Sequence, residues 1–133
     1  MADINKLKVD AKKVSGGVWV DYTDGVRLLI ARKPNPAFQE YMADLIEPHL
    51  ASIHAGTFDD KLDKLLTKKA VAKHVLLGWE NIEENGKPIE YSPENAFELF
   101  KNEDLVDLYH FVLTIAHSKE RYRYQETETA VKN

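Results

Sequence analysis

The sequence predicts an α+β fold, in which an N-terminal β-hairpin or small antiparallel sheet is followed by four to five helices. Two runs of β-forming residues, 18–22 and 26–32, flank the tripeptide Thr23-Asp24-Gly25. An Asp-Gly pair between such runs indicates a hairpin, because glycine accepts the positive φ that the turn requires. Glycine and proline together supply 11 of the 133 residues. This share, about 8%, is below the average of roughly 12%. The low share favours a helix-dominated chain over an all-β one.

We expect one domain over residues 1–124, β-rich in 1–33 and helical in 34–124, followed by a mobile polar tail at 125–133. A chain of this length can bury a core without metals or disulfides. Apolar residues alternate with lysines in residues 1–13, so this segment is expected to be partly ordered, as a strand or as a loose end.

The first helix is expected to begin at Pro36, with Asn35 as its cap. Apolar residues then recur on one helical face. Pro48 removes a backbone donor and clashes with the preceding turn, so a kink or break is expected there. Gly56 closes this segment.

A second long helix is predicted from Asp59-Asp60 through Leu77, ended by Gly78-Trp79. Beyond Ala70 its apolar residues surround the helix, so that end should be enclosed by other elements. Residues 80–91 are expected to form a loop or irregular hairpin around Asn85-Gly86.

A short helix is expected after Ser92-Pro93, and a last helix from Asn102 or Glu103. Apolar residues cover more than half of the last helix, which places it at the centre of a core or of a subunit interface. A homo-oligomer is therefore compatible with the sequence. Trp19, on the first β-rich run, is expected to be a core residue.

Composition excludes several functional classes. The net charge of −4 argues against a protein that holds the phosphate backbone of nucleic acid. The absence of cysteine removes thiol catalysis and Cys-ligated metals. No apolar stretch approaches the ~20 residues that span a bilayer.

The motifs of common enzymes are missing as well. There is no Gly-rich phosphate loop and no G-x-S-x-G elbow. His110 and His117 lie two helical turns apart, about 10.5 Å, too far to share one metal ion. We therefore expect a protein that is not an enzyme and that uses no cofactor or metal.

The charges are segregated along the chain. Residues 1–33 carry a balance of +3, whereas residues 80–107 hold nine acids and two lysines. Lys61, Lys64 and Lys68 form a basic face on the second long helix. This face is interpreted as a solvated surface or as a docking site for an acidic protein.

Taken in order, several segments resemble the small tail assembly chaperones of long-tailed bacteriophages and their prophage remnants. The resemblance runs from about Val14 to the end of the chain and is most specific from Trp79 to Asn95. Its segments are Trp19–Asp21, Leu28–Arg32, Asn35–Phe38, Leu76–Ile82, Asn85–Asn95 and Leu105–Leu108.

This resemblance implies a non-enzymatic protein of the host bacterial cytoplasm that is absent from the mature virion. Such chaperones bind the tape measure protein, keep it soluble, and help tail-tube subunits polymerise around it. A chaperone that binds an extended helix with apolar stripes is expected to have an apolar docking surface with a charged rim. The candidate contact residues are Trp79, Ile82, Ile89 and Tyr91 and any part of the last helix left uncovered, together with Lys61, Lys64 and Lys68. Trp79 has a competing interpretation, a core residue beneath its loop.

Two other functions stay open on the sequence alone. One is another tail morphogenesis component, such as a terminator or connector. The other is a small nucleic-acid-binding regulator that uses the lysine face.

Overall fold

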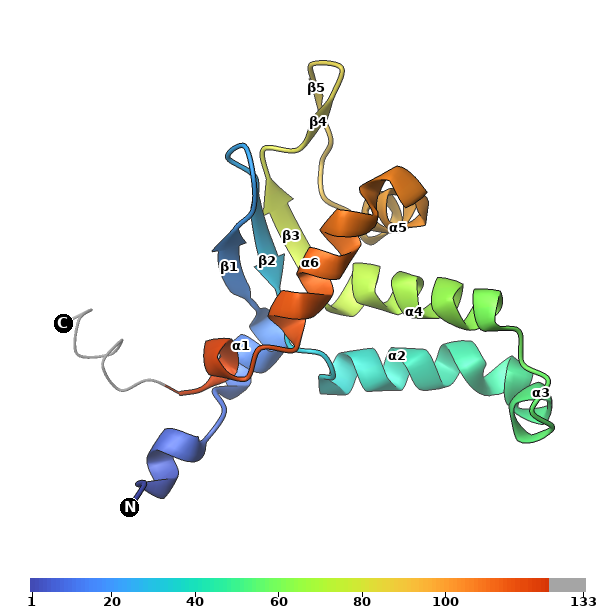
Figure 1. Cartoon of the computed structure of the whole chain (residues 1–133), viewed down its shortest axis with the longest axis horizontal. Helices are drawn as coiled ribbons and strands as arrows, with labels where there is room; N and C mark the ends of the chain where they lie inside the picture. Colours follow the sequence, from blue (N-terminus) through green and yellow to red (C-terminus); the bar gives the residue numbers. More distant parts are fainter. Residues whose placement is uncertain (125–133) are drawn as a thin grey trace.

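A computed structural model describes residues 1–124, and the expected tail at 125–133 lies outside the described residues. A three-stranded antiparallel sheet with the order β1-β2-β3 forms one part of the molecule (Figure 1). The strands are β1 (Val18–Asp21), β2 (Arg27–Ile30) and β3 (Leu76–Glu80). The α+β prediction is confirmed, with five α-helices following the β1–β2 hairpin in the described part of the chain.

The first hairpin forms as predicted. β1 pairs with β2 in a register that sets Val20 opposite Leu28. Asp24 and Gly25 both have positive φ, 53° and 80°. These values match a hairpin turn whose twist follows that of its strands.

The third strand corrects the sequence prediction. Residues 76–77 were expected to end the second long helix, but that helix, α4 (Asp60–His74), stops earlier. β3 then pairs with β2, with Trp79 opposite Leu28. The expected helix end, its expected stop at Gly78-Trp79 and the first residue of the expected loop thus form the other edge of the sheet.

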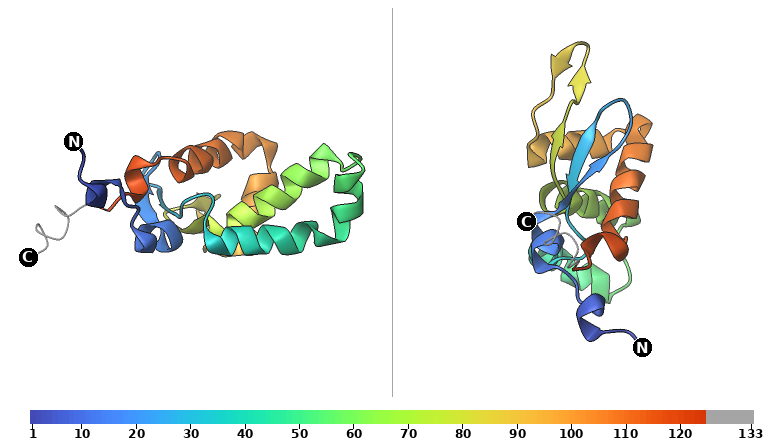
Figure 2. Two further views of the ribbon diagram at one scale, coloured as in Figure 1. Left: turned by 90° about the horizontal axis from the view of Figure 1, so that it is seen from below. Right: turned by 90° about the vertical axis from the view of Figure 1, so that its left-hand side faces the viewer.

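An extended helical pair lies beside the sheet (Figures 1 and 2). α2 (Pro36–Ile46) runs outward, and α4 returns against it. A 3-10 turn at Glu47–His49 and the short helix α3 (Leu50–His54) separate the two. The break expected at Pro48 is therefore confirmed.

The chain then forms a small two-stranded hairpin and two more helices. β4 (Glu83–Glu84) pairs with β5 (Lys87–Pro88) around the Asn85-Gly86 turn, as predicted. α5 (Pro93–Lys101) begins at its Ser92 cap, and α6 (Val106–Ala116) follows a 3-10 turn at Glu103–Leu105.

The core lies where α6, α5 and the C-terminal end of α4 meet one face of the sheet (Figures 1 and 2). Its fully buried side chains come from all of these elements, which is why apolar residues surround the end of α4 and most of α6. They include Leu28, Ile30, Val71, Val75, Leu76 and Val112.

The outer face of the sheet carries a different set of residues. Trp19, Leu29 and Gly78 form one cross-strand row. Trp19 is 42% exposed, so its predicted place in the core is wrong. Strand alternation explains this, because Val20 takes the inward position and Trp19 must face outward. Arg27 lies over the Trp19 ring and pairs with Asp21 and Glu80.

The N-terminal segment forms helical turns instead of a full strand. A 3-10 turn at Ile4–Leu7 precedes α1 (Ala11–Gly16). Residues 8–10 lie against the end of the described chain, through an isolated bridge between Val9 and Arg123. A last 3-10 turn, Glu120–Tyr122, precedes that contact and buries Tyr122.

Candidate partner-binding groove

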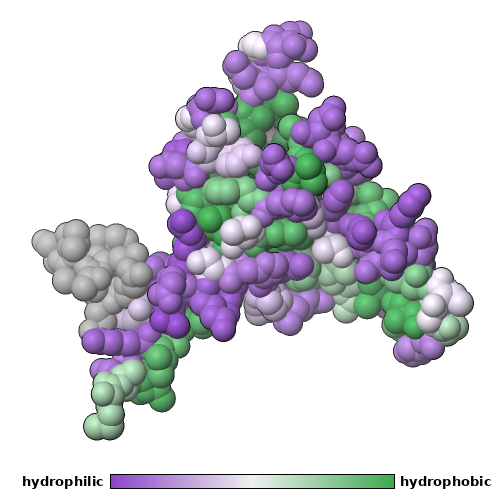
Figure 3. All heavy atoms as spheres, viewed as in Figure 1, coloured by the Kyte–Doolittle hydropathy of each residue, from purple (hydrophilic) through white to green (hydrophobic). Residues whose placement is uncertain are grey.

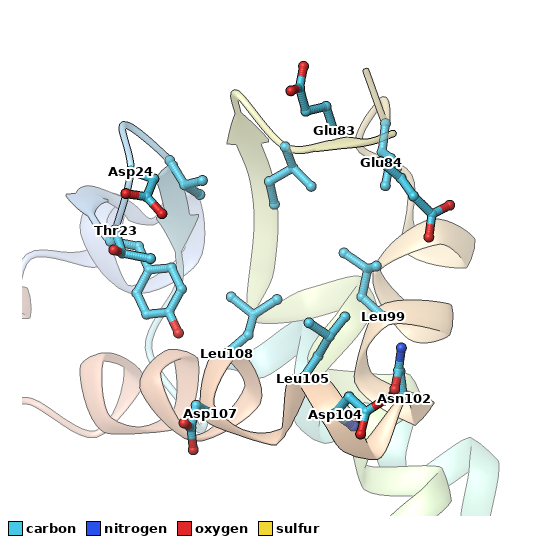
Figure 4. A pocket seen from close by; sticks show the side chains of 14 residues that line it. Thr23, Asp24, Glu83, Glu84, Leu99, Asn102, Asp104, Leu105, Asp107 and Leu108 are labelled. Carbon is cyan, nitrogen blue, oxygen red and sulfur yellow. Dashed lines mark hydrogen bonds between the residues drawn. The ribbon is translucent and has the colours of Figure 1, made fainter. Parts of the chain in front are cut away.

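A groove of about 520 Å³ opens between the two hairpins and the corner where α5 meets α6 (Figure 4). Its walls come from segments that are distant in the sequence: the β1–β2 turn, the β4–β5 hairpin, and residues 99–108. Its volume lies within the range of ligand pockets, and it can take a few side chains of a protein partner.

The floor of the groove is apolar. Leu99, Leu105 and Leu108 point into the space between the hairpins (Figure 4). The complete apolar lining is Tyr22, Val26, Ile82, Ile89, Leu99, Leu105 and Leu108.

The rim is acidic. Five carboxylates surround the floor, and none of the lining residues, all within the described part of the chain, is basic. The carboxylates belong to Asp24, Glu83, Glu84, Asp104 and Asp107. Five acidic residues and no basic one among the lining give the groove a negative potential, which repels anions and attracts cationic groups.

Hydrogen bonds fix the two hairpins that form the walls. The Asn81 side-chain amide donates to the carbonyl oxygen of Gly25 at 2.9 Å, which ties the end of β3 to the first turn. The Ile89 backbone N–H donates to the Ile82 carbonyl oxygen at 2.8 Å. The Tyr22 ring packs on Phe111 of α6, with centroids 4.6 Å apart. Contacts between segments that are distant in the sequence therefore position the walls of the groove.

Among the aromatic candidates, Trp79 lies beneath this region and is only 8% exposed. Its indole N–H donates to the Ile89 carbonyl oxygen at 2.7 Å. Trp79 therefore supports the β4–β5 hairpin from below, which favours the core interpretation over direct partner contact.

Tyr91 also supports the site from beneath. Its ring meets Trp79 edge-on, at 5.1 Å between centroids. Its hydroxyl lies 2.6 Å from the Leu76 carbonyl oxygen and 2.9 Å from that of Ala72, where α4 passes into β3. Burial, together with the nearby Glu94 carboxylate, raises the pKa of Tyr91 to about 12.

Ile82 and Ile89, the remaining apolar candidates, lie in the groove itself. Both are half-buried and pack against the core at the base of the β4–β5 hairpin. Of the four apolar candidates, Ile82 and Ile89 line this groove, and all four line a neighbouring cleft of about 370 Å³.

The three lysine candidates lie elsewhere. Lys64 and Lys68 line a second cleft of about 330 Å³ between α4 and α6. The Lys68 ammonium stands 5.5 Å from the centroid of the buried Tyr109 ring. Lys61 is exposed one turn earlier on α4. The lysine face and the acidic groove are therefore two separate surfaces.

Sequence reasoning missed the groove residues of the β1–β2 turn and Leu99 of α5, and it named the last helix as a candidate surface without saying which of its residues stay uncovered. The acidic run 80–107 was a usable signal for the rim, since four of the five rim carboxylates belong to it. The Leu105 and Leu108 pair, three residues apart, was a usable signal for an apolar stripe. Tyr22, Asp24 and Val26 join the site only through the pairing of β2 with β3.

Within residues 1–124, no cluster of three His, Asp or Glu side chains is placed to hold a metal ion. In the same described part of the chain, every helix is too short or too polar to cross a membrane.

Comparison with protein-family models gives a match. The model of the family described as YdaY prophage protein matches residues 33–133, about three-quarters of the chain. The match includes the β4–β5 hairpin and the α5–α6 corner, whereas the β1–β2 hairpin precedes it. No curated protein and no solved structure matches the chain. By the extent of the family match, the chain belongs to the YdaY prophage protein family.

Proposed function

We propose that this prophage protein is a tail assembly chaperone, which binds the tape measure protein during tail morphogenesis and is absent from the mature virion. The observation that supports this function best is the groove, with its apolar floor and a rim of five carboxylates. A tape measure protein is a long helical chain with apolar stripes, and such a stripe loses contact with water when it docks on an apolar floor.

The same groove argues against the nucleic-acid regulator. Phosphate groups would be repelled by the carboxylates of the rim. The lysine face offers only a few cations, and one of them, Lys68, already stands against an aromatic ring. Experiment distinguishes the chaperone from another tail component, a terminator or connector.

The test is co-expression with the tape measure protein of the same prophage. Leu105→Asp places a charge on the groove floor, whereas Leu50→Asp places one on α3, where Leu50 is 41% exposed and outside the groove. Wild type and Leu50→Asp should keep the tape measure protein soluble and co-purify with it, and Leu105→Asp should not.

Circular dichroism of both variants checks that their fold is retained. An unchanged soluble fraction of the tape measure protein in the presence of wild-type chaperone would contradict the proposal. Recovery of the protein from purified mature virions would favour the terminator or connector instead. Salt-sensitive binding of DNA would favour the regulator.

A further inference from the structure

The first nine residues, which we call the N-terminal arm, expose an unusual share of the apolar surface. Four of the nine exposed large hydrophobic residues of the described chain lie in this arm, namely Met1, Ile4, Leu7 and Val9. Ile4 is 70% exposed and Leu7 is 59% exposed. Figure 3 shows these hydrophobic atoms gathered at the lower left of the molecule. Contiguous exposed apolar surface of this kind marks an interaction site.

The arm has the shape of a small docking motif. Ile4 and Leu7 are the first and last residues of one 3-10 turn. Residues three apart in a 3-10 turn eclipse one another, so both side chains lie on the same side of it. The groove, at about 520 Å³, can take such a pair of side chains but not a whole helix.

The charges of the arm complement those of the groove. Lys6 and Lys8 flank Leu7, and both are exposed. The one acid of the arm, Asp3, accepts a hydrogen bond from the Asn5 backbone N–H at 3.0 Å and so caps the turn. The arm therefore carries an apolar pair flanked by ammonium groups, and the groove has an apolar floor lined by acidic residues, so the two surfaces are complementary.

We propose that the groove binds the N-terminal arm of a second copy of this chain. The arm of the same copy is held away from the groove, because the Asp10 N–H donates to the Tyr122 carbonyl oxygen at 2.7 Å and the Tyr124 N–H to that of Lys8 at 3.0 Å. These bonds anchor the base of the arm near the start of β1. The groove lies beyond the other end of β1, and the arm leads away from it (Figure 1).

Arm and groove are different surfaces, so the contact is heterologous. Two copies that exchange arms form a dimer, and copies that dock head to tail form a longer assembly. The contact is small, so the association is weak and depends on concentration. This self-association does not rest on the proposed function. If both hold, a tape measure segment competes with the arm for the same groove.

The test is sedimentation velocity of the full chain over a range of concentrations. Leu7→Asp damages the arm, and Leu105→Asp damages the groove. Each should weaken self-association at least about tenfold, because a carboxylate would be placed in an apolar contact beside other carboxylates. Leu50→Asp, the same change at an exposed leucine of α3, should leave it unchanged.

Mixing the two damaged variants gives the decisive result. Leu7→Asp keeps an intact groove, and Leu105→Asp keeps an intact arm. Alone, each should self-associate at least about tenfold more weakly than wild type, and together they should form a 1:1 complex. A monomeric wild type at every concentration up to its solubility limit, or failure of the mixture to form the complex, overturns the proposal.

The same variants separate this inference from the proposed function. Leu7→Asp, with its groove intact and empty, should still keep the tape measure protein soluble. If Leu7→Asp loses self-association but wild type never binds the tape measure protein, only the proposed function fails. If wild type binds the tape measure protein and is monomeric, only the present inference fails.

Discussion

Asn35 does more than cap a helix. It is the one polar residue buried in the described chain, and its Oδ1 accepts from the Phe38 N–H at 3.0 Å. Its amide also donates to the carbonyl oxygens of Arg32 and His74, both at 2.8 Å. This single side chain therefore joins the end of β2, the start of α2 and the end of α4.

Replacing Asn35 should cost more than replacing an ordinary cap. Asn35→Ala should lower the free energy of unfolding by about 2–3 kcal/mol, since a cap and two further hydrogen bonds are lost. Ser92→Ala is the matched control, because Ser92 also precedes a proline but makes only the capping bond to Asn95. It should cost about 1 kcal/mol. Urea unfolding measures both, and equal losses would refute the joining role of Asn35.

Tyr122 links stability to alkaline pH. It is fully buried, and its hydroxyl donates to the Ile30 carbonyl oxygen at 2.9 Å. Burial raises its pKa above the ordinary value of 10.0, and burial also raises that of Tyr109 to about 12. Above pH 10 the unfolded chain loses phenolic protons that the folded chain retains. The contribution of these tyrosines to the free energy of unfolding should therefore be fully present below pH 10 and decrease as the pH rises above 10.

Tyr122→Phe checks this assignment. Below pH 10 the variant should be about 1 kcal/mol less stable, because a buried hydrogen bond is lost. Above pH 10 its stability should fall less steeply than that of wild type. Urea unfolding at several pH values on either side of 10 measures both effects. Parallel curves for the two proteins would show that Tyr122 does not contribute to the alkaline loss.

At the scale of elements, the sequence predicted what is local. The Asp24-Gly25 turn, the caps Asn35 and Ser92 and the break at Pro48 each depend on neighbouring residues, and all are found. The first two residues of β3, Leu76 and Leu77, were predicted as the end of a helix because burial on both sides looks the same in the sequence for a helix end and for a strand. Only its pairing with β2, nearly fifty residues earlier, distinguishes the two.

The junction between α1 and β1 contains two glycines with opposite requirements. Gly17 has φ +83°, and a Cβ there would lie 3.1 Å from the backbone carbon and oxygen of Ile30. Gly16 is the last residue of α1, and a Cβ there would meet nothing within 4 Å. Close approach of the chain to β2 therefore requires glycine at only one of the two positions.

Alanine substitutions should separate these positions. Gly17→Ala should destabilise the protein by about 2 kcal/mol, from the left-handed backbone and the contact with Ile30. Gly16→Ala should be neutral or stabilising by up to about 1 kcal/mol, because alanine is the better helix residue. Thermal unfolding of the two variants provides the measurement. A tolerated Gly17→Ala would mean that β2 lies further from this turn.

At the scale of the whole molecule, the groove shows why the site was only partly predictable. Its acidic rim follows from the composition of residues 80–107, and Ile82 and Ile89 were candidates on the sequence alone. Its other wall depends on the fold, since Asp24 reaches the rim through the strand order β1-β2-β3. Trp79 was predicted to lie at the edge of a loop. It belongs instead to β3, where its side chain faces the core.

α4 is enclosed by the core at its C-terminal end, near the sheet, and is less covered at its N-terminal end, near α3. Near the sheet, Ala70, Val71 and Ala72 are fully buried. Toward α3, Leu65 is 39% exposed and α4 has α2 as its neighbour. Stability should therefore be unevenly distributed along a single helix, with the outer turns opening more readily than the inner ones.

Side-chain truncations at the two ends of α4 should differ in cost, and the one that removes fewer carbon atoms should cost more. Val71→Ala removes fewer carbon atoms than Leu65→Ala, yet it should cost about 2 kcal/mol, because it leaves a cavity in the core. Leu65→Ala should cost less than about 1 kcal/mol, since water already reaches that side chain. Native-state hydrogen exchange should agree, with amides of residues 70–75 protected near the level of global unfolding and those of the outer turns exchanging sooner. Uniform protection along α4, or a larger loss at Leu65, would mean that the outer half is covered in solution, and the arm-exchanged assembly proposed above would then need a second contact there.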